Sequence, residues 1–461
     1  MAGRRSWALG ALVVLGAALP TAPPTAAPTA PPAPACPASL QAAIDATATG
    51  GTLRLGSCAF HESVTVDRAM TIVGPAVIDG GNVRRTWMTV TASGVTVDGL
   101  TMRNAAAGGY QSGSLNVDGV SHFTLRNATL SGGSYADLRL WHGSGHTIRN
   151  SLISSGRAIG VLGWDFTDSL ISGNRITGNN TTGADAGNEA GGIKLGQVRG
   201  VDLVNNEVDH NAGVGMWCDV YCATITISGN AVHHNSHQGI LFEISTGASI
   251  TGNAVWENGW SFTAWGWGGG IVVSSSAGAD VSGNTVAWNA DGIVVLSQNR
   301  SGSPAATNNH VHNNVVAIAP QPGDGDDAYA IAWLADWSSP MFDADAGNAG
   351  ADNAVGLVDV RSDVPFAWSG QDLADPAKFA ETPGGARLRV LDLSQTRDLL
   401  GSAGIPVDPV PTVAQRTPAG RDVYRAGLVV LSVAGFGVLL FVAAILLRRR
   451  RGRRRGATPP T

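Results

Sequence analysis

Pairs of asparagines five residues apart recur through the middle of this chain. An apolar residue stands three positions before the first asparagine and another stands two positions after it, as Ile227 and Val232 do around Asn230. Such regular spacing is typical of a chain built from short turns that repeat one conformation. The pairs are Asn174/Asn179, Asn206/Asn211, Asn230/Asn235, Asn253/Asn258, Asn284/Asn289 and Asn309/Asn314.

The length of the repeat indicates the kind of turn. Val208 and Val232 are 24 residues apart, and Val232 and Val255 are 23 residues apart. That interval is too short for a strand, a helix and a second strand, but it suits one turn of a parallel β-helix. Turns stacked about 4.8 Å apart would align valine and isoleucine side chains into internal columns. Asparagine suits the corners because it tolerates the left-handed backbone conformation and its amide can bond to the next turn.

From about Cys36 to Asn314 the chain therefore resembles the right-handed parallel β-helix superfamily, the pectate-lyase-like proteins. The resemblance implies an all-β fold, a single-stranded right-handed parallel β-helix solenoid whose open core is capped by an N-terminal helix. Handedness is taken from the superfamily and from the general rule for parallel crossovers. The resemblance also implies lyase or hydrolase action on an acidic glycan, but no family-specific catalytic motif identifies a reaction.

The repeat and the composition divide the chain into successive segments. A short amphipathic helix is expected over Pro37 to Asp45, because Leu40, Ala43 and Ile44 fall on one face and proline suits a first helical turn. The expected segments are a signal peptide with a Pro/Ala/Thr-rich stretch (1–35), the cap and first turns (36–80), the β-helix repeats (81–320), a closing segment (321–400), a proline-rich linker (401–425), a transmembrane helix (426–447) and an arginine-rich tail (448–461).

Both ends of the chain predict export and membrane attachment. Arg4 and Arg5 precede the apolar run from Trp7 to Leu19, which is typical of a secretory signal. The 22 uncharged residues from Ala426 to Leu447 are long enough to span a bilayer, and seven arginines follow them. The expected localisation is the cell membrane, with a single pass, the N-terminal ectodomain outside and the C-terminal tail in the cytoplasm. A cell-wall sorting signal is the weaker alternative because no LPxTG sequence precedes the apolar run.

Charge and cysteine content fit an exported protein. Nine of the 30 basic residues lie in the two ends, so the rest of the chain has 21 basic and 35 acidic residues. Because this part is net negative, nucleic acid and anionic membrane surfaces are not expected as its partners. Four cysteines predict two disulfides, Cys36 with Cys58 and Cys218 with Cys222. A metal site built from Cys218, Cys222 and His210 or His234 is the less favoured alternative.

Three of the intervals between inward apolar residues are longer than the others. Their extra residues fall just before the glycine that opens the next strand, which is the same corner of the coil each time. Insertions stacked at one corner form a wall beside one sheet. The three insertions are Asn104 to Gly113, Asn179 to Gly191 and Asn258 to Gly269.

The strands beside this wall carry the candidate chemistry on their outward faces. Because a strand alternates faces, every second residue of each strand points away from the core. Asp219 and Glu243 are then stacked on adjacent turns, about 5 Å apart at the backbone, and one is expected to have a raised pKa unless a cation such as Lys194 compensates. One outward column is predicted as Arg139, Gly160, Lys194, Trp217, Leu241, Val272 and Val294, and its neighbour as Trp141, Leu162, Gly196, Asp219, Glu243, Ser274 and Leu296.

Three functions use such a group of residues. A retaining glycosidase needs an acid and a second carboxylate at about this separation, which Asp219 and Glu243 supply. A polysaccharide lyase needs a base such as Lys194 or Arg139, with Ca²⁺ or an arginine to neutralise the uronate carboxyl. A binding or adhesion module needs only carboxylates and tryptophans that hold sugar hydroxyls and ring faces. The opposing interpretation is that Asp219 and Glu243 are solvated surface residues bonded to corner amides.

The tryptophans near this face have two interpretations. Trp141, Trp217, Trp260, Trp265 and Trp267 would suit stacking on sugar rings of an extracellular polysaccharide. The lower half of the same sheet presents an outward apolar strip that must be covered, and cover by the third insertion or by the segment after Ile331 is the favoured role. The strip consists of Leu241, Val272, Val294 and Leu296.

Histidines gather on another face. The position three after the first asparagine reads Thr177, Asp209, His233, Trp256, Ala287 and His312, with His210, His234 and His237 nearby. Such density invites a metal or acid–base site, with Asp209 against His233. Corner histidines bonded to neighbouring turns are the more common case, so no metal site is assigned from the sequence.

Overall fold

The fold is described from a computed structural model that covers residues 35–298, 300, 302–318, 328–336, 346–358 and 364–407. The expected signal peptide, transmembrane helix and cytoplasmic tail lie outside the described residues. Within those residues, no helix is both long enough and apolar enough to cross a membrane.

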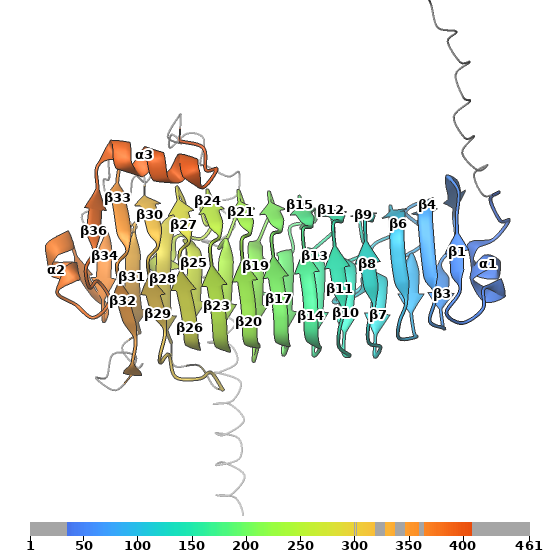
Figure 1. Ribbon diagram of the computed structural model, residues 1–461, viewed down its shortest axis with the longest axis horizontal. Helices are drawn as coiled ribbons and strands as arrows, with labels where there is room; N and C mark the ends of the chain where they lie inside the picture. The colour runs from blue at the N-terminus through green and yellow to red at the C-terminus, as the bar shows by residue number, and fades with distance from the viewer. Residues whose placement is uncertain are drawn as a thin grey trace, which may run out of the picture. The chain divides into compact units, whose positions relative to one another are not determined.

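The described chain is a coil of parallel strands that forms two sheets, in which a strand pairs with the corresponding strands of the turns before and after it (Figure 1). A typical turn has one strand in a 13-stranded sheet and two in a 23-stranded sheet, as in β19, β20 and β21. The pairing is parallel except between the last two strands of the smaller sheet, β34 and β35. This is the parallel solenoid that the repeat length predicts.

The strand bounds set the length of each side of the coil. The 13-stranded sheet contains β3 (Val64–Val66), β5 (Met88–Val90), β7 (Gly113–Asp118), β10 (Ala136–Trp141), β13 (Ile159–Trp164), β16 (Gly191–Gly196), β19 (Val214–Asp219), β22 (Ile240–Glu243), β25 (Gly269–Ser274), β28 (Asp291–Ser297), β31 (Ile331–Ala335), β34 (Phe366–Trp368) and β35 (Gln371–Leu373). The 23-stranded sheet contains β1 (Thr52–Arg54), β2 (Cys58–Phe60), β4 (Thr71–Asp79), β6 (Thr96–Arg103), β8 (Thr124–Arg126), β9 (Thr129–Ser131), β11 (Thr147–Arg149), β12 (Leu152–Ser154), β14 (Thr167–Ser172), β15 (Arg175–Thr177), β17 (Arg199–Val204), β18 (Glu207–Asp209), β20 (Ala223–Ser228), β21 (Ala231–His233), β23 (Thr246–Thr251), β24 (Ala254–Trp256), β26 (Ala277–Ser282), β27 (Thr285–Ala287), β29 (His310–His312), β30 (Val315–Ile318), β32 (Ala349–Ala351), β33 (Ala354–Leu357) and β36 (Arg389–Leu391).

Asparagine side chains connect each turn to the next along the corners. The amide of Asn230 is buried, and its oxygen accepts hydrogen bonds from the backbone and side-chain nitrogens of Asn206. Its own backbone and side-chain nitrogens donate to Asn253 of the following turn. Each asparagine therefore repeats the bonds of the one below it, and the inward valines Val208 and Val232 stack in the core between such corners.

The pair Asn309/Asn314 does not occupy the two corners that the sequence pattern predicts. Asn314, not Asn309, continues the line through Asn284, because the backbone and side-chain nitrogens of Asn284 both donate to Asn314. Asn309 lies at the preceding corner, where its backbone nitrogen donates to Asn348. The corners at Ala279, Asn284 and Asn289 are each five residues apart, so an isolated asparagine pair does not reveal which two of these corners it occupies.

The N-terminal end of the core is covered by α1 (Leu40–Ala46), as expected. Leu40 and Ile44 are fully buried in the main core, and the Ser39 side chain caps the helix by accepting from the Ala42 nitrogen. The expectation that Pro37 lies in the first helical turn is wrong, because Pro37 precedes the Ser39 cap. The disulfide between Cys36 and Cys58 joins the segment before the helix to β2.

At the other end, stacking continues beyond the expected boundary at residue 320. β31 pairs with β28, and β33 pairs with β30, so another turn is added and Asn353 extends the line of Asn314. The helix α2 (Pro376–Ala380) places Phe379 on Phe366 with their ring centroids 4.7 Å apart. The helix α3 (Leu393–Ser402) extends into the expected linker, and the indole of Trp288 donates to the Pro406 carbonyl.

Removing one corner amide is expected to destabilise the coil. The change Asn230→Ala deletes the hydrogen bonds to both neighbouring turns and leaves buried backbone groups unpaired, which should cost about 2–4 kcal/mol. The urea midpoint of unfolding would measure the loss. The control is Ser249→Ala on the exposed face of β23, which should stay within about 0.5 kcal/mol of the parent chain. Equal effects of the two changes would contradict the proposed role of the asparagine line.

Asp137 is a buried carboxyl on β10 that the sequence analysis did not single out. Its Oδ1 accepts a 2.6 Å hydrogen bond from the Gly133 nitrogen, whereas Oδ2 has no hydrogen-bond partner among the described residues. Burial raises the pKa of this carboxyl well above its ordinary value. The folded protein therefore holds the Asp137 proton more tightly than the unfolded chain does.

This shift gives stability a specific pH dependence. Because the folded pKa is raised, the stabilising contribution of Asp137 is present below the unfolded value and is lost as the pH rises toward the folded value. Compared with Asp137→Asn, the parent chain should therefore lose up to about 1.4 kcal/mol per pH unit above pH 4. Urea unfolding at several pH values would measure this difference. The exposed change Asp202→Asn is the control, and a pH-independent difference for Asp137→Asn would contradict the assignment.

Candidate functional site

The three insertions lie at one corner, as the sequence predicts, because they lead into β7, β16 and β25 of the 13-stranded sheet. The second and third contribute to the rim of a pocket of about 440 Å³ on the outer face of that sheet. Its floor comes from β16, β19 and β22. The residues around it include Asn188, Lys194, Trp217, Asp219, Gln238, Glu243, Phe262, Trp267, Gln298 and Arg300.

Lys194 lies at the centre of a compact polar group. Its Nζ is 2.9 Å from Oδ2 of Asp219 and 3.6 Å from the ring centroid of Trp217. The same nitrogen donates to the carbonyl of Asn188 in the second insertion. The parallel register explains this contact, since Lys194 pairs with Trp217 and Gly196 pairs with Asp219. A carboxylate, a carbonyl and an indole face are all groups that attract an ammonium.

Glu243 forms a second ion pair beside the first. Its Oε1 binds the guanidinium of Arg300, which comes from the segment that follows β28. Burial raises the pKa of Glu243 by disfavouring the charged carboxylate, and Asp219 raises it further by repulsion, while Arg300 acts in the opposite direction. Two carboxyls on adjacent turns are therefore brought together as predicted, and each has its own cation.

The interpretation of Asp219 and Glu243 as solvated surface residues is wrong. Asp219 is 8% exposed and Glu243 is 5% exposed, because the loops of the wall and the segment around Arg300 close over them. Arg300 is a residue that the sequence analysis missed. It lies outside the repeated strands, so no periodic signal connects it with Glu243, which precedes it by 57 residues.

One strand of the predicted columns is displaced by two residues. In the observed register Arg139 pairs with Leu162, and Leu162 pairs with Lys194, so Leu162 replaces Gly160 in the column. A shift of two preserves the alternation of inward and outward residues, which is why the sequence pattern did not exclude it. Gly160 lies nearer the corner, where an added Cβ would be 2.8 Å from the amide of Asn179.

Arg139 is therefore not brought into the pocket. It is two turns away from Lys194, and its Nη1 donates to Asn116 at 2.8 Å and to Asp118 at 3.0 Å. Its guanidinium also lies over the ring of Trp141, 4.2 Å from the centroid. These contacts form a separate surface group.

The five tryptophans do not form one row. Trp217 and Trp267 line the pocket, whereas Trp260 is buried and its indole donates to the Trp288 carbonyl. Trp265 is exposed in the third insertion, and Trp141 stacks on Trp164 with a centroid distance of 5.9 Å. Only two of the predicted sugar-binding tryptophans therefore line this pocket.

The favoured alternative role, covering the apolar strip, is confirmed. The strip of outward apolar residues below the pocket is buried in one cluster with the later residues Tyr329, Ala332 and Leu334, and Trp267 packs against it. An added Cβ on Gly266 of the third insertion would be 2.9 Å from Val294, so the loop lies directly on the strip. The loop and Tyr329 both contribute to the cover.

The predicted Cys218–Cys222 disulfide is present and closes the corner directly after β19. Because each sulfur is bonded to the other, these cysteines are not available for the alternative metal site.

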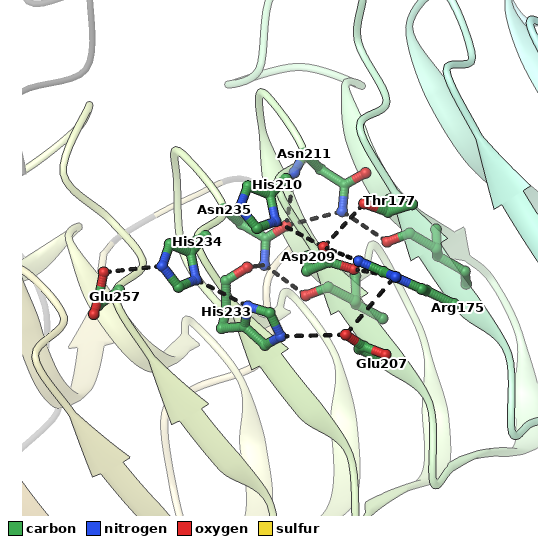
Figure 2. A network of polar contacts seen from close by, with 12 residues as sticks. Arg175, Thr177, Glu207, Asp209, His210, Asn211, His233, His234, Asn235 and Glu257 are labelled. Atoms are coloured by element: carbon green, nitrogen blue, oxygen red, sulfur yellow. Dashed lines mark hydrogen bonds and ion pairs between the residues drawn. The ribbon is translucent and has the colours of Figure 1, made fainter. Parts of the chain in front are cut away.

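His237 lines the pocket, whereas His210, His233 and His234 lie together at the 23-stranded sheet (Figure 2). Asp209 pairs with His233 as predicted, and His233 pairs with Trp256. His312 does not belong to this column, because it pairs with Ser282. Burial and repulsion from His234 lower the pKa of His233 to about 4, so its imidazole is neutral at pH 7.

Comparison with known proteins agrees with this architecture. The sequence matches the family described as a right handed beta helix region over residues 89–187 and 113–286. This chain is a right-handed parallel β-helix protein. The fold expected from the repeat and the handedness expected from the resemblance are thereby confirmed. A search of curated protein sequences finds no match.

Solved structures with the same fold have very different sequences. The β-helix resembles a point mutant of the periplasmic alginate epimerase AlgG at 14% identity, covering 75% of this chain and 78% of the other, with a TM-score of 0.50. It also resembles a PL6 alginate lyase bound to a trisaccharide at 15% identity, covering 77% and 92%, with a TM-score of 0.40. A third structure is the Dettilon tailspike protein at 15% identity and a TM-score of 0.43, covering 68% of this chain but only 62% of the tailspike. At these identities the likeness establishes the fold alone.

Proposed function

We propose that this β-helix protein binds a polysaccharide in the pocket around Lys194. The observation that carries the proposal is that two opposite-charge pairs, Lys194 with Asp219 and Arg300 with Glu243, occupy one pocket together with tryptophan rings. Carboxylates accept hydrogen bonds from sugar hydroxyls, and an indole face supports a sugar ring. The volume of about 440 Å³ falls in the range of small-ligand sites.

The charges favour an acidic sugar over a neutral one. A uronate carboxyl that enters the pocket finds Lys194 and Arg300 within the same lining, and arginine matches a carboxylate with two parallel hydrogen bonds. Trp267 lies 5.5 Å from the Arg300 guanidinium, so a sugar held by that arginine also meets an aromatic face. The binding partner is therefore an acidic extracellular polysaccharide.

Hydrolysis of the bound glycan is a second candidate, favoured by the carboxyl pair. Retaining glycosidases use an acid and a nucleophile about 5 Å apart, and adjacent turns of a coil are separated by about 4.8 Å. Glu243, with its raised pKa, is suited to donate a proton to the leaving oxygen, and Asp219, paired with Lys194, is suited to act as the nucleophile. In the lyase alternative Lys194 would act as the base, but its Nζ already contacts Asp219 and the Asn188 carbonyl, so the carboxyl pair favours hydrolysis.

Calcium does not fit this pocket. Ca²⁺ takes six to eight oxygen ligands, typically from several carboxylates. The two carboxylates here already carry ion pairs with Lys194 and Arg300. Binding and hydrolysis in this pocket therefore use the side chains alone, without a bound Ca²⁺ ion.

Binding should depend on the pocket residues in a specific way. The change Lys194→Met keeps the stem that covers Trp217 but removes the charge, so affinity for uronate oligosaccharides should fall about tenfold or more. Isothermal titration would measure it, beginning with alginate because the epimerase in the comparison acts on it. The matched control is Arg126→Met, which breaks the partly buried pair with Asp98 on the other sheet and should leave affinity unchanged.

Product analysis in the same experiment separates binding from hydrolysis. A hydrolase releases new reducing ends without unsaturated products, and Glu243→Gln should reduce that rate by a factor of about 100 or more while the glycan still binds. Binding without products would support the binding function alone. Equal binding by the parent chain and Lys194→Met would contradict the proposed site, and unsaturated products would contradict hydrolysis in favour of a lyase.

We also propose that the protein is exported and held at the cell membrane by residues 426–447. Support comes from the apolar run itself, from the arginines that follow it, and from the two disulfides, because disulfides persist in oxidising compartments outside the cytoplasm.

Deleting residues 408–461 should therefore release the β-helix into the medium, whereas the complete chain should sediment with membranes. Cell fractionation followed by alkylation of free thiols would measure both location and disulfide state. Recovery of the complete chain in the cytosol with four free thiols would contradict export.

A further inference from the structure

We propose that His210, His233 and His234 form a binding site for a divalent transition metal such as Zn²⁺ on the 23-stranded sheet. The three imidazoles come from adjacent turns, at β18 and β21, and lie on a different sheet from the polysaccharide pocket (Figure 2). The site does not depend on the proposed function.

The ring nitrogens are already arranged closely enough to share one ion. Nδ1 of His233 and Nδ1 of His234 are 2.9 Å apart, and their rings are inclined by 84°. Two nitrogens bound to one tetrahedral Zn²⁺ lie about 3.3 Å apart, so a small opening of this contact would admit the ion. In the metal-free protein one of the two nitrogens must carry the proton that joins them. A metal ion replaces that proton.

His210 supplies the third nitrogen from the turn below. Its ring stacks on that of His234 with a centroid distance of 4.8 Å, and a ligand atom of His210 lies within 4.8 Å of one on His233. The His210 side chain is 60% exposed, so its ring is free to turn toward an ion held by the other two. Both His210 and His234 have positive φ angles, of 55° each, which places their rings in register on successive turns.

Two of the three histidines also have a carboxylate that orients them. His210 contacts Asp209 through Nδ1 at 2.7 Å, and His234 contacts Glu257 through Nε2 at 3.0 Å (Figure 2). A carboxylate that accepts one ring N–H fixes the tautomer and leaves the other nitrogen with a free lone pair, as in carboxylate–histidine–zinc groups. Glu207 lies 3.6 Å from Nε2 of His233, which is near but beyond hydrogen-bond distance.

The contacts of Asp209 decide what kind of ion fits. Its buried carboxylate already accepts from Arg175 through both Nε and Nη2 and from the hydroxyl of Thr177. Asp209 therefore orients His210 rather than acting as a direct ligand, and the nearby guanidinium disfavours a site rich in anionic oxygen. A set of three imidazoles suits Zn²⁺, Cu²⁺ or Ni²⁺ and not Ca²⁺ or Mg²⁺.

Titration of the full-length protein, purified without a polyhistidine tag, tests the site. Co²⁺ should bind with the visible absorption of nitrogen-ligated cobalt, Zn²⁺ should displace it, and Ca²⁺ should not. The changes His233→Ala and His234→Gln should each weaken Zn²⁺ binding about tenfold or more, and Glu257→Gln should weaken it about tenfold through the loss of orientation. The control is His312→Gln, which removes a lone histidine paired with Asp280 and should leave binding unchanged.

Circular dichroism of each variant separates loss of metal from loss of fold, and His234→Gln is the mildest change because that side chain is partly exposed. Absence of saturable Co²⁺ or Zn²⁺ binding by the parent chain would overturn the proposal. Binding that survives both His233→Ala and His234→Gln in folded protein would also overturn it. Neither result would bear on the polysaccharide pocket, whose residues lie on the other sheet.

Discussion

The structure depends on hydrogen bonds between asparagine side chains on successive turns. At Asn230 and Asn235, each amide accepts from the turn before and donates to the turn after, so the bonds continue along the corner without interruption. A parallel strand that slipped by one residue would turn its whole core face outward. The amides oppose such a slip because each one fits only the corner of the next turn. Because the register is fixed, valine and isoleucine recur at the same inward positions of successive turns and fill the interior.

A fixed register also determines which outward residues meet. Lys194 lies beside Trp217, and Asp219 lies beside Glu243, because their positions coincide on neighbouring turns rather than because they are close in sequence. The same rule brings Asp209 next to His233 on the other sheet. The coil therefore assembles two chemically different groups, and loops and carboxylates complete them: Arg300 joins the first group and Glu257 the second.

The parts of the fold that could be predicted are those that repeat. Val208, Val232 and Val255 gave the turn length, and the three insertions gave the position of the wall. The predicted pairing of Arg139 with Gly160 was wrong because a shift by two residues leaves the inward and outward pattern unchanged. Asn309 was misplaced because two successive pairs of corners on the 23-stranded sheet have the same five-residue spacing. Arg300 could not be predicted at all, since it lies in a non-repeating segment whose path depends on tertiary packing. Burial of Asp219 and Glu243 depends on those same loops.

The most direct test of this account is the register between two neighbouring turns, measured on the 23-stranded sheet. Thr226 on β20 pairs with Ser249 on β23, and both side chains point away from the core. Cysteines at directly paired positions on neighbouring strands are within disulfide range, whereas a diagonal offset of two residues separates them by about 7–8 Å. Peptide mapping after oxidation should find the new disulfide in Thr226→Cys with Ser249→Cys and none in Thr226→Cys with Thr251→Cys. The opposite result would mean that the turns are stacked in another register, and neither the pocket nor the histidine group would exist as described.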